Sequence, residues 1–278
     1  MSAWSFLRSR RWAGYLALVI VFAIACCALG SWQLNRRAEA LAEVARIDAN
    51  YDAEPVPVAE ALPEPSAFDV DQRWLVVALS GTYLADEEVV VRNRPFGGSS
   101  GFEVITPFRL DDGTVFMVDR GWIAQASDGR PSEFAAPPAG HVEITARLKA
   151  GEERIAGRTS TGDEFATIDL PELAQRVGES AYTGAYGVLV QSASDAAEPP
   201  LAAPRPVRDE GPHLSYALQW FVFAIMGFIG LAWAANQERK ALVETSGGIE
   251  ASKTAREPRK PPRERGDADV EDEVLDRR

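Results

Sequence analysis

Two long apolar stretches divide the hydrophobic pattern of this chain. Residues 12–32 and residues 214–234 contain no charged side chain. A helix of either length reaches about 30 Å, the thickness of the hydrocarbon core of a bilayer. Tryptophan or tyrosine lies near both ends of each stretch, where rings with one polar edge favour the membrane interface. The pattern therefore predicts two transmembrane helices that form a hairpin around the residues between them.

The first apolar stretch has a rival interpretation as a cleaved signal peptide. It is longer than the about 7–15 apolar residues of a signal-peptide core, so we expect an uncut anchor. Cys26 and Cys27, the only cysteines of the chain, lie inside it. A copper site is the alternative interpretation, but nothing nearby supplies the further soft ligands it needs, and we expect these thiols to be small apolar filler.

The residues between the two stretches, 33–213, change to a β pattern. Residues 35–48 first predict a helix that continues or restarts outside the membrane. Residues 52–67, rich in proline, alanine and acidic residues, predict an extended linker or a loop along the surface. Strands are predicted at 74–79, 89–91, 102–108, 114–118, 142–148 and 186–190, and a short helix at 170–177. The expected fold class is membrane α+β, in which the hairpin surrounds a mostly antiparallel β domain with one or two short helices.

The charge distribution gives the hairpin an orientation. Three arginines (8, 10 and 11) precede the first helix, and Arg239 and Lys240 follow the second. These positions predict cytoplasmic termini, residues 1–11 and 235–278, and an extracytoplasmic central domain. Five arginines (36, 37, 46, 205 and 208) flank the opposite side of the helices. The loop between the helices exceeds the roughly 60 residues within which such charges orient a protein, so the N-terminal arginines decide.

The acidic excess of residues 35–212 restricts the partners. This region has 16 Lys and Arg against 30 Asp and Glu, a net charge of −14. Such a surface repels phosphate backbones, so we expect no nucleic-acid binding, although it can meet a basic partner. In residues 241–278, 18 of 38 residues are charged with both signs mixed, which predicts a disordered tail.

Catalytic motifs are missing from the sequence. It has only two histidines and lacks a nucleophile elbow, a zinc-ligand spacing, a phosphate-binding glycine loop and a dinucleotide fingerprint. His141 opens a strand and is interpreted as a solvated loop histidine. We therefore expect a protein that is not an enzyme, although carboxylate chemistry remains open.

His213 is the residue with the greatest chemical interest. It begins the second apolar helix, and Tyr216, Ala217, Trp220 and Ala224 fall on the same helical face. An imidazole above aromatic rings can ligate a haem iron while the macrocycle lies against the rings. The alternative is an interfacial histidine above an aromatic belt, and the residues alone favour that alternative.

Five blocks, in order, resemble the surfeit locus protein 1 family, assembly factors of cytochrome c oxidase. Residues 30–36 (GSWQLNR), with Trp32 and Gln33, resemble the Trp-Gln motif of that family. Residues 81–83 with 91–94, residues 101–108 and residues 118–122 (VDRGW, with Arg120, Gly121 and Trp122) follow. Residues 213–221 (HLSYALQWF, with Gln219) are similar to its second-helix signature. The resemblance covers residues 12–236 and leaves out the cysteines, the linker and the tail.

This resemblance implies a non-enzymatic role in building the oxidase at the plasma (inner) membrane, by delivering or inserting haem a into subunit I. It implies that His213 binds the haem iron, with Tyr216 and Trp220 against the macrocycle, and that haem a is held transiently. Arg36 would pair with haem propionates, or else be a solvated helix residue. Arg120 and Trp122 are expected to hold the β domain together. The implied partners are oxidase subunit I, haem a synthase and the lipid bilayer. The alternative is a membrane-tethered scaffold or sensor whose acidic domain binds a protein partner.

Overall fold

The structure, a computed structural model, describes residues 4–190 and 199–254. The chain forms two compact units: Met1–Asn35 with Pro212–Arg278, and Arg36–Gly211. Two helices dominate the first unit, α1 (Arg10–Asn50), whose last turns belong to the second unit, and α4 (His213–Thr254), while the 3₁₀ turn η1 (Ser5–Arg8) precedes α1. The second unit contains the strands and the short helices. The two long helices flanking a β-rich domain confirm the expected fold class.

Both long helices extend beyond the predicted apolar spans. α1 runs without a break from the apolar span through the helix predicted at residues 35–48. α4 continues past Ala234 to Thr254, so the prediction that disorder starts at residue 241 is wrong as far as residue 254; residues 255–278 lie outside the described residues. The polar segments that follow each apolar span are rich in Ala, Leu, Glu, Arg and Lys, which favour the helix, and proline does not interrupt them. Both α1 and α4 are long and apolar enough to cross a membrane.

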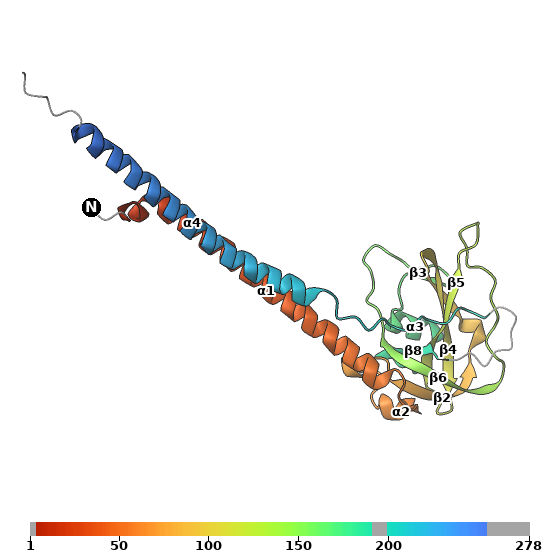
Figure 1. Cartoon of the computed structure of the whole chain (residues 1–278). Coiled ribbons are helices and arrows are strands. Elements are labelled where there is room, and N and C mark those ends of the chain that lie inside the picture. The colour runs from red at the N-terminus through yellow and green to blue at the C-terminus, as the bar shows by residue number, and fades with distance from the viewer. Residues whose placement is uncertain (1–3, 191–198, 255–278) are drawn as a thin grey trace, which may run out of the picture. The chain divides into compact units, whose positions relative to one another are not determined.

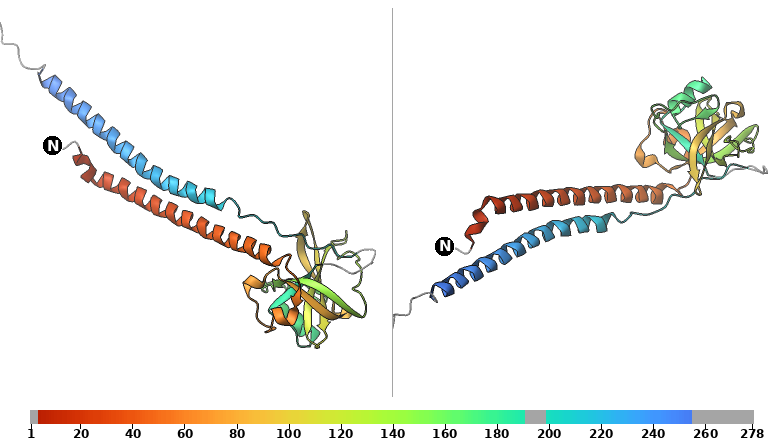
Figure 2. Two further views of the ribbon diagram at one scale, coloured as in Figure 1. Left: turned by 60° about the horizontal axis from the view of Figure 1, so that its bottom comes forward. Right: turned by 90° about the horizontal axis from the view of Figure 1, so that it is seen from above.

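α1 and α4 lie side by side along the first unit (Figures 1 and 2). Small side chains make the seam between them, in which Ala23 and Cys26 of α1 pack with Ala224 of α4. The buried positions 23, 26 and 30 on α1 and 217, 224 and 235 on α4 are three, four, seven or eleven residues apart. These spacings keep the positions on one face of each helix, and the small residues there let the two backbones approach closely.

The second unit is one mostly antiparallel sheet that closes on itself. Its strands are β1 (Val56–Pro57), β2 (Val76–Tyr83), β3 (Val89–Phe96), β4 (Ser99–Leu110), β5 (Val115–Ala124), β6 (His141–Ala150), β7 (Glu164–Phe165) and β8 (Ala185–Leu189). They follow the order β1-β2-β6-β8-β5-β4-β3-β7, and an additional pairing of β2 with β4 completes a ring of five strands. Gly81 opposes Leu110 at this closure, and a Cβ at Gly81 would lie 2.0 Å from the carbonyl oxygen of Arg109. The missing side chain allows the two strands to meet.

Two cores stabilise this unit on opposite sides of the sheet. One contains Leu79, Phe108, Phe116 and Leu148, and the other contains Met117 and the residues under the short helix α3 (Leu170–Val177). Asp169 caps α3, because its side chain accepts a hydrogen bond from the Glu172 N–H. Alternate residues of β5 therefore belong to different cores, as the period of a strand requires.

The segment predicted as a linker, residues 52–67, packs against the first core instead. It contains β1 and the short helix α2 (Val58–Ala61), and both Val58 and Leu62 are buried in that core. The sequence did not predict these contacts, because two apolar residues among prolines and acidic residues form no periodic pattern. After α2 the chain makes the 3₁₀ turn η2 (Val70–Gln72), and the turn η3 (Ala85–Glu87) joins β2 to β3.

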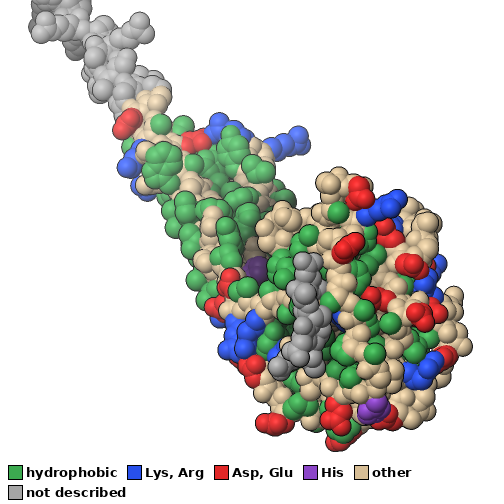
Figure 3. Space-filling model, turned by 90° about the vertical axis from the view of Figure 1, so that its right-hand side faces the viewer, with side chains coloured by type: hydrophobic (Ala, Val, Ile, Leu, Met, Phe, Trp, Pro, Cys, Tyr) green, Lys and Arg blue, Asp and Glu red, His purple; other side chains and the backbone are tan. Residues whose placement is uncertain are grey.

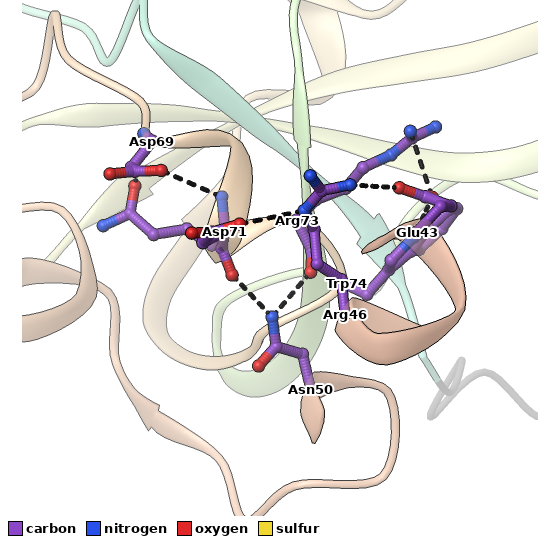
Figure 4. Close-up of polar contacts among 8 residues, drawn as sticks. Glu43, Arg46, Asn50, Asp69, Asp71, Arg73 and Trp74 are labelled. Carbon is purple, nitrogen blue, oxygen red and sulfur yellow. Dashed lines mark hydrogen bonds and ion pairs between the residues drawn. The ribbon is translucent and has the colours of Figure 1, made fainter. Parts of the chain in front are cut away.

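The last turns of α1 are anchored to η2 and the start of β2 (Figure 4). Glu43 accepts a hydrogen bond from Trp74 Nε1 at 2.8 Å and pairs with Arg73 at 3.1 Å. The side-chain amide of Asn50 donates to the carbonyls of Asp71 and Arg73, both at 2.8 Å. Trp74 has a φ of 70°, an uncommon conformation for a residue with a side chain, which this network supports. The polar half of α1 is therefore part of the β unit.

Candidate functional site

His213 is bonded to α1 by its imidazole. It is the first residue of α4, and its side chain is half-buried. The loop before it turns at Gly211, whose φ is 69° and whose N–H donates to the Asp209 carboxylate at 2.8 Å. Nδ1 of His213 lies 2.9 Å from Oε1 of Gln33. The amide oxygen is an acceptor only, so in this contact Nδ1 carries a proton and donates to Gln33, and in the neutral ring Nε2 then has the lone pair.

The second ring nitrogen of His213 is therefore the basic one. Within residues 4–190 and 199–254, no hydrogen bond is recorded for Nε2. A neutral imidazole with its proton fixed on one nitrogen presents a lone pair on the other, which is the form that binds a metal. The contact with Gln33 also restricts rotation of the ring. The site thus has one oriented nitrogen donor.

An aromatic surface continues from His213 along α4. Tyr216 is 49% exposed, and Trp220 is half-buried and packs edge-on against Phe223 with centroids 5.9 Å apart. Ala217, on the same turn, is fully buried in the seam. The helical face predicted from the sequence is thus split between the seam and the surface. On α1, Trp32 next to Gln33 is 55% exposed. In the view of Figure 3, hydrophobic side chains cover the helices, and acidic side chains are scattered over the β unit.

Two further residues named from the sequence, Arg36 and Gln219, are exposed. Gln219 is exposed on α4. Arg36 lies in the second unit, where its exposed guanidinium pairs with Glu39 at 2.6 Å on the same helix. Arg37 pairs with Glu210 at 2.8 Å in that unit. The Arg36 pair is that of a solvated helix surface, whereas Arg37 is partly buried, and a role of Arg36 toward haem propionates stays a prediction.

A second polar contact joins the helices at the opposite end of the seam. Trp12 Nε1 donates to Glu238 at 3.0 Å, and Arg11 pairs with the same carboxylate. Trp12 is 4% exposed. Gln33 and Trp12 are 21 residues apart, so about 31 Å of apolar helix separates the two polar contacts, close to the thickness of a hydrocarbon core. The sequence interpretation missed Glu238. It follows His213 by 25 residues, and at 100° per residue this rotation of about 2500° is close to a whole number of turns, so both residues lie on one helical face.

Arg120, from the block VDRGW, is part of the β unit. Its side chain is 3% exposed, pairs with Glu88 at 2.7 Å and donates to the Ala135 carbonyl at 2.8 Å. Thr106 also donates to Glu88, and the Arg120 guanidinium lies 6.0 Å from the centre of the Tyr83 ring. Burial raises the pKa of Tyr83 to about 12. Arg120 therefore links β5 to the residues before β3 and after β5.

Gly121 and Trp122 have structural contacts of their own. Gly121 has a φ of 128°, and a Cβ there would lie 2.4 Å from the carbonyl oxygen of Leu201. Trp122 pairs with Leu201 through its backbone, donates from Nε1 to the Arg94 carbonyl at 2.8 Å and stacks on Phe96. The glycine thus allows the segment that returns toward α4 to lie directly on β5.

The second histidine belongs to an exposed polar cluster. His141 Nε2 lies 2.9 Å from Asp111 and 3.2 Å from the hydroxyl of Ser80, which itself donates to Asp111 at 2.6 Å. These residues are those of a hydrolase triad, but the carboxylate and the hydroxyl contact the same ring nitrogen. A proton relay needs them on opposite nitrogens. The hydrogen bonds from Ser80 and His141 lower the pKa of Asp111, as expected of an ionised surface carboxylate. In the described part of the chain, no group of three or more His, Cys, Asp or Glu could hold a metal ion.

These features define a two-helix hairpin, with an oriented histidine at one end, that carries a closed β domain between its helices. The sequence profile described as the SURF1 family matches residues 20–225, and the chain belongs to that family. An uncharacterized SURF1-like protein of Mycobacterium tuberculosis is 32% identical over 242 residues, which cover 85% of this chain and 88% of the relative. A SURF1-like protein of Drosophila melanogaster is 27% identical over 69% of this chain and 68% of its own. The yeast cytochrome oxidase assembly protein SHY1 is 27% identical over 53% of this chain and 39% of its own. These matches confirm the family resemblance seen in the sequence.

Proposed function

We propose that this protein is a non-enzymatic membrane assembly factor for cytochrome c oxidase that holds haem a transiently for subunit I, with His213 as the iron ligand. Membership of the SURF1 family supports the assembly role, and so does the name of the yeast relative, cytochrome oxidase assembly protein. The haem role depends on the residues around His213.

The contact between His213 and Gln33 carries this proposal. A ligating histidine needs its second nitrogen hydrogen-bonded, because that bond fixes the tautomer and increases the basicity of the ligand. Gln33 supplies such a bond at 2.9 Å and leaves Nε2 for the iron. Gln33 is thus a positioning residue. The exposed ring of Tyr216 would offer apolar surface to a macrocycle, and the half-buried ring of Trp220, which packs against the seam, would border that surface.

The membrane arrangement follows from the helices and the charges. Arg8, Arg10 and Arg11 hold the N-terminal end of α1 at the cytoplasmic face of the plasma (inner) membrane. His213 then lies at the extracytoplasmic end of its span, together with the β unit on that side. Subunit I of the oxidase and haem a synthase are the partners that such a haem carrier would meet. When bound, haem a would supply an iron that His213 ligates, and the protein itself would bind, orient and release the group.

The absorbance spectrum of the full-length protein tests this function. The protein is purified in detergent from cells that make haem a, and we expect a haem a band in the visible spectrum. His213→Ala should abolish or shift the band. His141→Ala is the matched control, since it removes the other histidine from an exposed cluster, and its spectrum should equal the wild type. A spectrum unchanged by His213→Ala rejects His213 as the ligand.

The assembly role has a separate test in the deletion strain. We expect membranes of that strain to lose the haem a absorbance of the oxidase. Normal oxidase spectra would contradict the assembly role whatever the purified protein binds. If affinity capture then recovered a complex other than the oxidase, the chain would be a tethered scaffold or sensor that acts through its acidic domain.

A further inference from the structure

A cavity of about 410 Å³ lies in the β unit, outside the site at His213. It is lined by the end of β3, the middle of β4, the bulge of β5 and the returning segment at residues 203–204. Pockets for small ligands are about 300–1,000 Å³. The lining includes two carboxylates, from Asp119 and Glu103, and two aromatic rings, from Phe96 and Trp122.

Asp119 is a buried carboxylate with incomplete hydrogen bonding. It is 2% exposed, and one of its oxygens accepts from the Gly121 N–H at 2.9 Å. This bond spans the irregular pairing between β4 and β5. One oxygen of Asp119 therefore has a structural role. In the parts of the chain that the structure describes, its second oxygen receives no hydrogen bond. Because Asp119 lines the cavity and this oxygen is not one of the fully buried polar atoms, it is the oxygen that a ligand in the cavity reaches.

The charges around Asp119 do not balance. On the neighbouring strand, Glu103 Oε2 pairs with Arg94 Nε at 3.1 Å, although the two atoms do not form a well-directed hydrogen bond. Arg94 is already engaged by both oxygens of Glu152, at 2.8 and 2.6 Å. The other cation is Lys149 of β6. Three carboxylates thus face two cations.

The remaining charged and titratable neighbours do not supply the missing cation. Lys149 Nζ lies 5.5 Å from the centre of the Tyr186 ring, on β8. Burial, with nearby carboxylates, raises the pKa of Tyr186, so its hydroxyl stays neutral. The cluster therefore has one negative charge in excess when all three carboxylates are ionised.

The aromatic wall of the cavity suits a cation. Trp122 and Phe96 stack with centroids 5.1 Å apart and an interplanar angle of 23°. The bond from Trp122 Nε1 to the Arg94 carbonyl fixes the indole. Indole faces attract ammonium and guanidinium groups, and the attraction increases when the cation leaves water. The wall and the two carboxylates thus favour the same type of ligand.

We propose that this cavity binds an alkylammonium or guanidinium group, which pairs with the carboxylates of Asp119 and Glu103 and lies against Trp122. The group comes from a free amine or from a lysine or arginine side chain of a partner polypeptide. The net charge of −14 on residues 35–212 increases the local concentration of either source. This binding site does not depend on haem or on His213.

A proton and this ligand compete for Asp119. Burial, and then the charge of Glu103, raise the pKa of Asp119 to about 7. Below that pH a proton neutralises the excess charge of the cluster, and the ligand must displace it. Binding therefore releases a proton near neutral pH and weakens as the pH falls.

Calorimetry on the full-length protein in detergent tests the site. The probes are agmatine, which carries a guanidinium and an ammonium group, and the peptide acetyl-Gly-Gly-Arg-Gly-Gly-amide. We expect saturable binding at pH 8, at least tenfold weaker binding at pH 6, and a binding heat that depends on the ionisation enthalpy of the buffer. Asp119→Asn keeps the shape and the acceptor for Gly121, and should weaken binding at pH 8 at least tenfold. Glu103→Gln is a second variant in case the first does not fold.

Asp128→Asn is the matched control, because Asp128 is an exposed carboxylate of the same unit. It should bind as the wild type does. A peptide that binds tenfold tighter than agmatine identifies a partner side chain as the source, and the reverse identifies a free amine. No saturable binding of either probe at pH 8 overturns the proposal. So does equal affinity in the wild type and in correctly folded Asp119→Asn or Glu103→Gln.

Discussion

Gln33 and His213 are 180 residues apart in the sequence, and their side chains meet at 2.9 Å at one end of the helix pair. Each comes from a block that resembles a family motif, one at the end of the first apolar span and one at the start of the second. The contact joins the two blocks physically, because the side-chain amide of Gln33 restricts the tautomer and the orientation of the His213 ring.

The first prediction concerns this contact. Gln33→Leu removes the acceptor for Nδ1, so the ring loses its fixed tautomer, and we expect about 10–100-fold weaker haem a retention with a shifted band. Gln219→Leu is the matched control, because Gln219 is an exposed glutamine on α4. Absorbance during dilution or exchange into apomyoglobin measures retention. Equal retention by the wild type and Gln33→Leu would remove Gln33 from the site.

The second prediction concerns the seam of the hairpin. A Cβ at Gly30 would lie 2.8 Å from the Phe221 ring, whereas a Cβ at Gly14 would have no heavy atom within 4 Å. Gly30→Ala should therefore destabilise the helix pair by about 1–3 kcal/mol, as overpacking does. Gly14→Ala should be neutral. Titration with SDS in mixed micelles, followed by circular dichroism, measures the difference. If Phe221→Leu does not rescue Gly30→Ala, the ring is not the cause.

The third prediction concerns the close contact between Gly121 of β5 and Leu201, in the segment of the chain that leads to α4. Gly121→Ala places a Cβ 2.4 Å from the Leu201 carbonyl oxygen at a φ of 128°. Because backbone must move, we expect a loss of about 3 kcal/mol or more in the free energy of unfolding. Gly140→Ala has a φ of 82° but open space around it, and should cost about 1–2 kcal/mol. Thermal unfolding by near-ultraviolet circular dichroism compares them, and equal losses would argue against the close approach.

The fourth prediction concerns the buried cation of β5. Arg120→Met leaves Glu88 as an uncompensated charge, which should cost about 3–5 kcal/mol of stability. Arg130→Met is the control, since its side chain is 84% exposed and its nearest carboxylate is 3.9 Å away. That change should stay within about 0.5 kcal/mol. The same thermal unfolding measurement compares the two variants. If Arg120→Met does not change the free energy of unfolding, Glu88 is solvated.

The fifth prediction is a dependence of stability on pH. The pKa of Asp119 is about 7 in the folded state, above its ordinary value of 3.8. Between these values the folded state holds a proton that the unfolded state has released, so this residue makes the stability fall as the pH rises, and the loss is constant above about pH 7. Asp119→Asn lacks this slope, and its stability relative to the wild type should increase between pH 4 and pH 7. A difference that does not change with pH would show an ordinary pKa.

Local pattern predicted the long helices, the main strands and α3, but not β1, α2 or β7. The helix at residues 170–177 has the bounds that its capping aspartate and early proline predicted, and the main strands lie where apolar alternation placed them. Local pattern failed where tertiary contacts, rather than periodicity, determine which residues are buried or helical. Val58 and Leu62 lie in a segment that reads as a linker, and residues 241–254 continue a helix despite their charge.

The sequence by itself determined the two apolar spans, the β character of the residues between them and the charge of that domain. These follow from period, length and composition, which neighbouring residues in the chain express. Only the tertiary structure decided that β2 meets β4 to close the ring, that Gln33 orients His213 and that Asp119 lies beside Glu103 at a cavity. Such contacts join residues far apart in the chain, and they depend on how strands and helices pack, which no local pattern records.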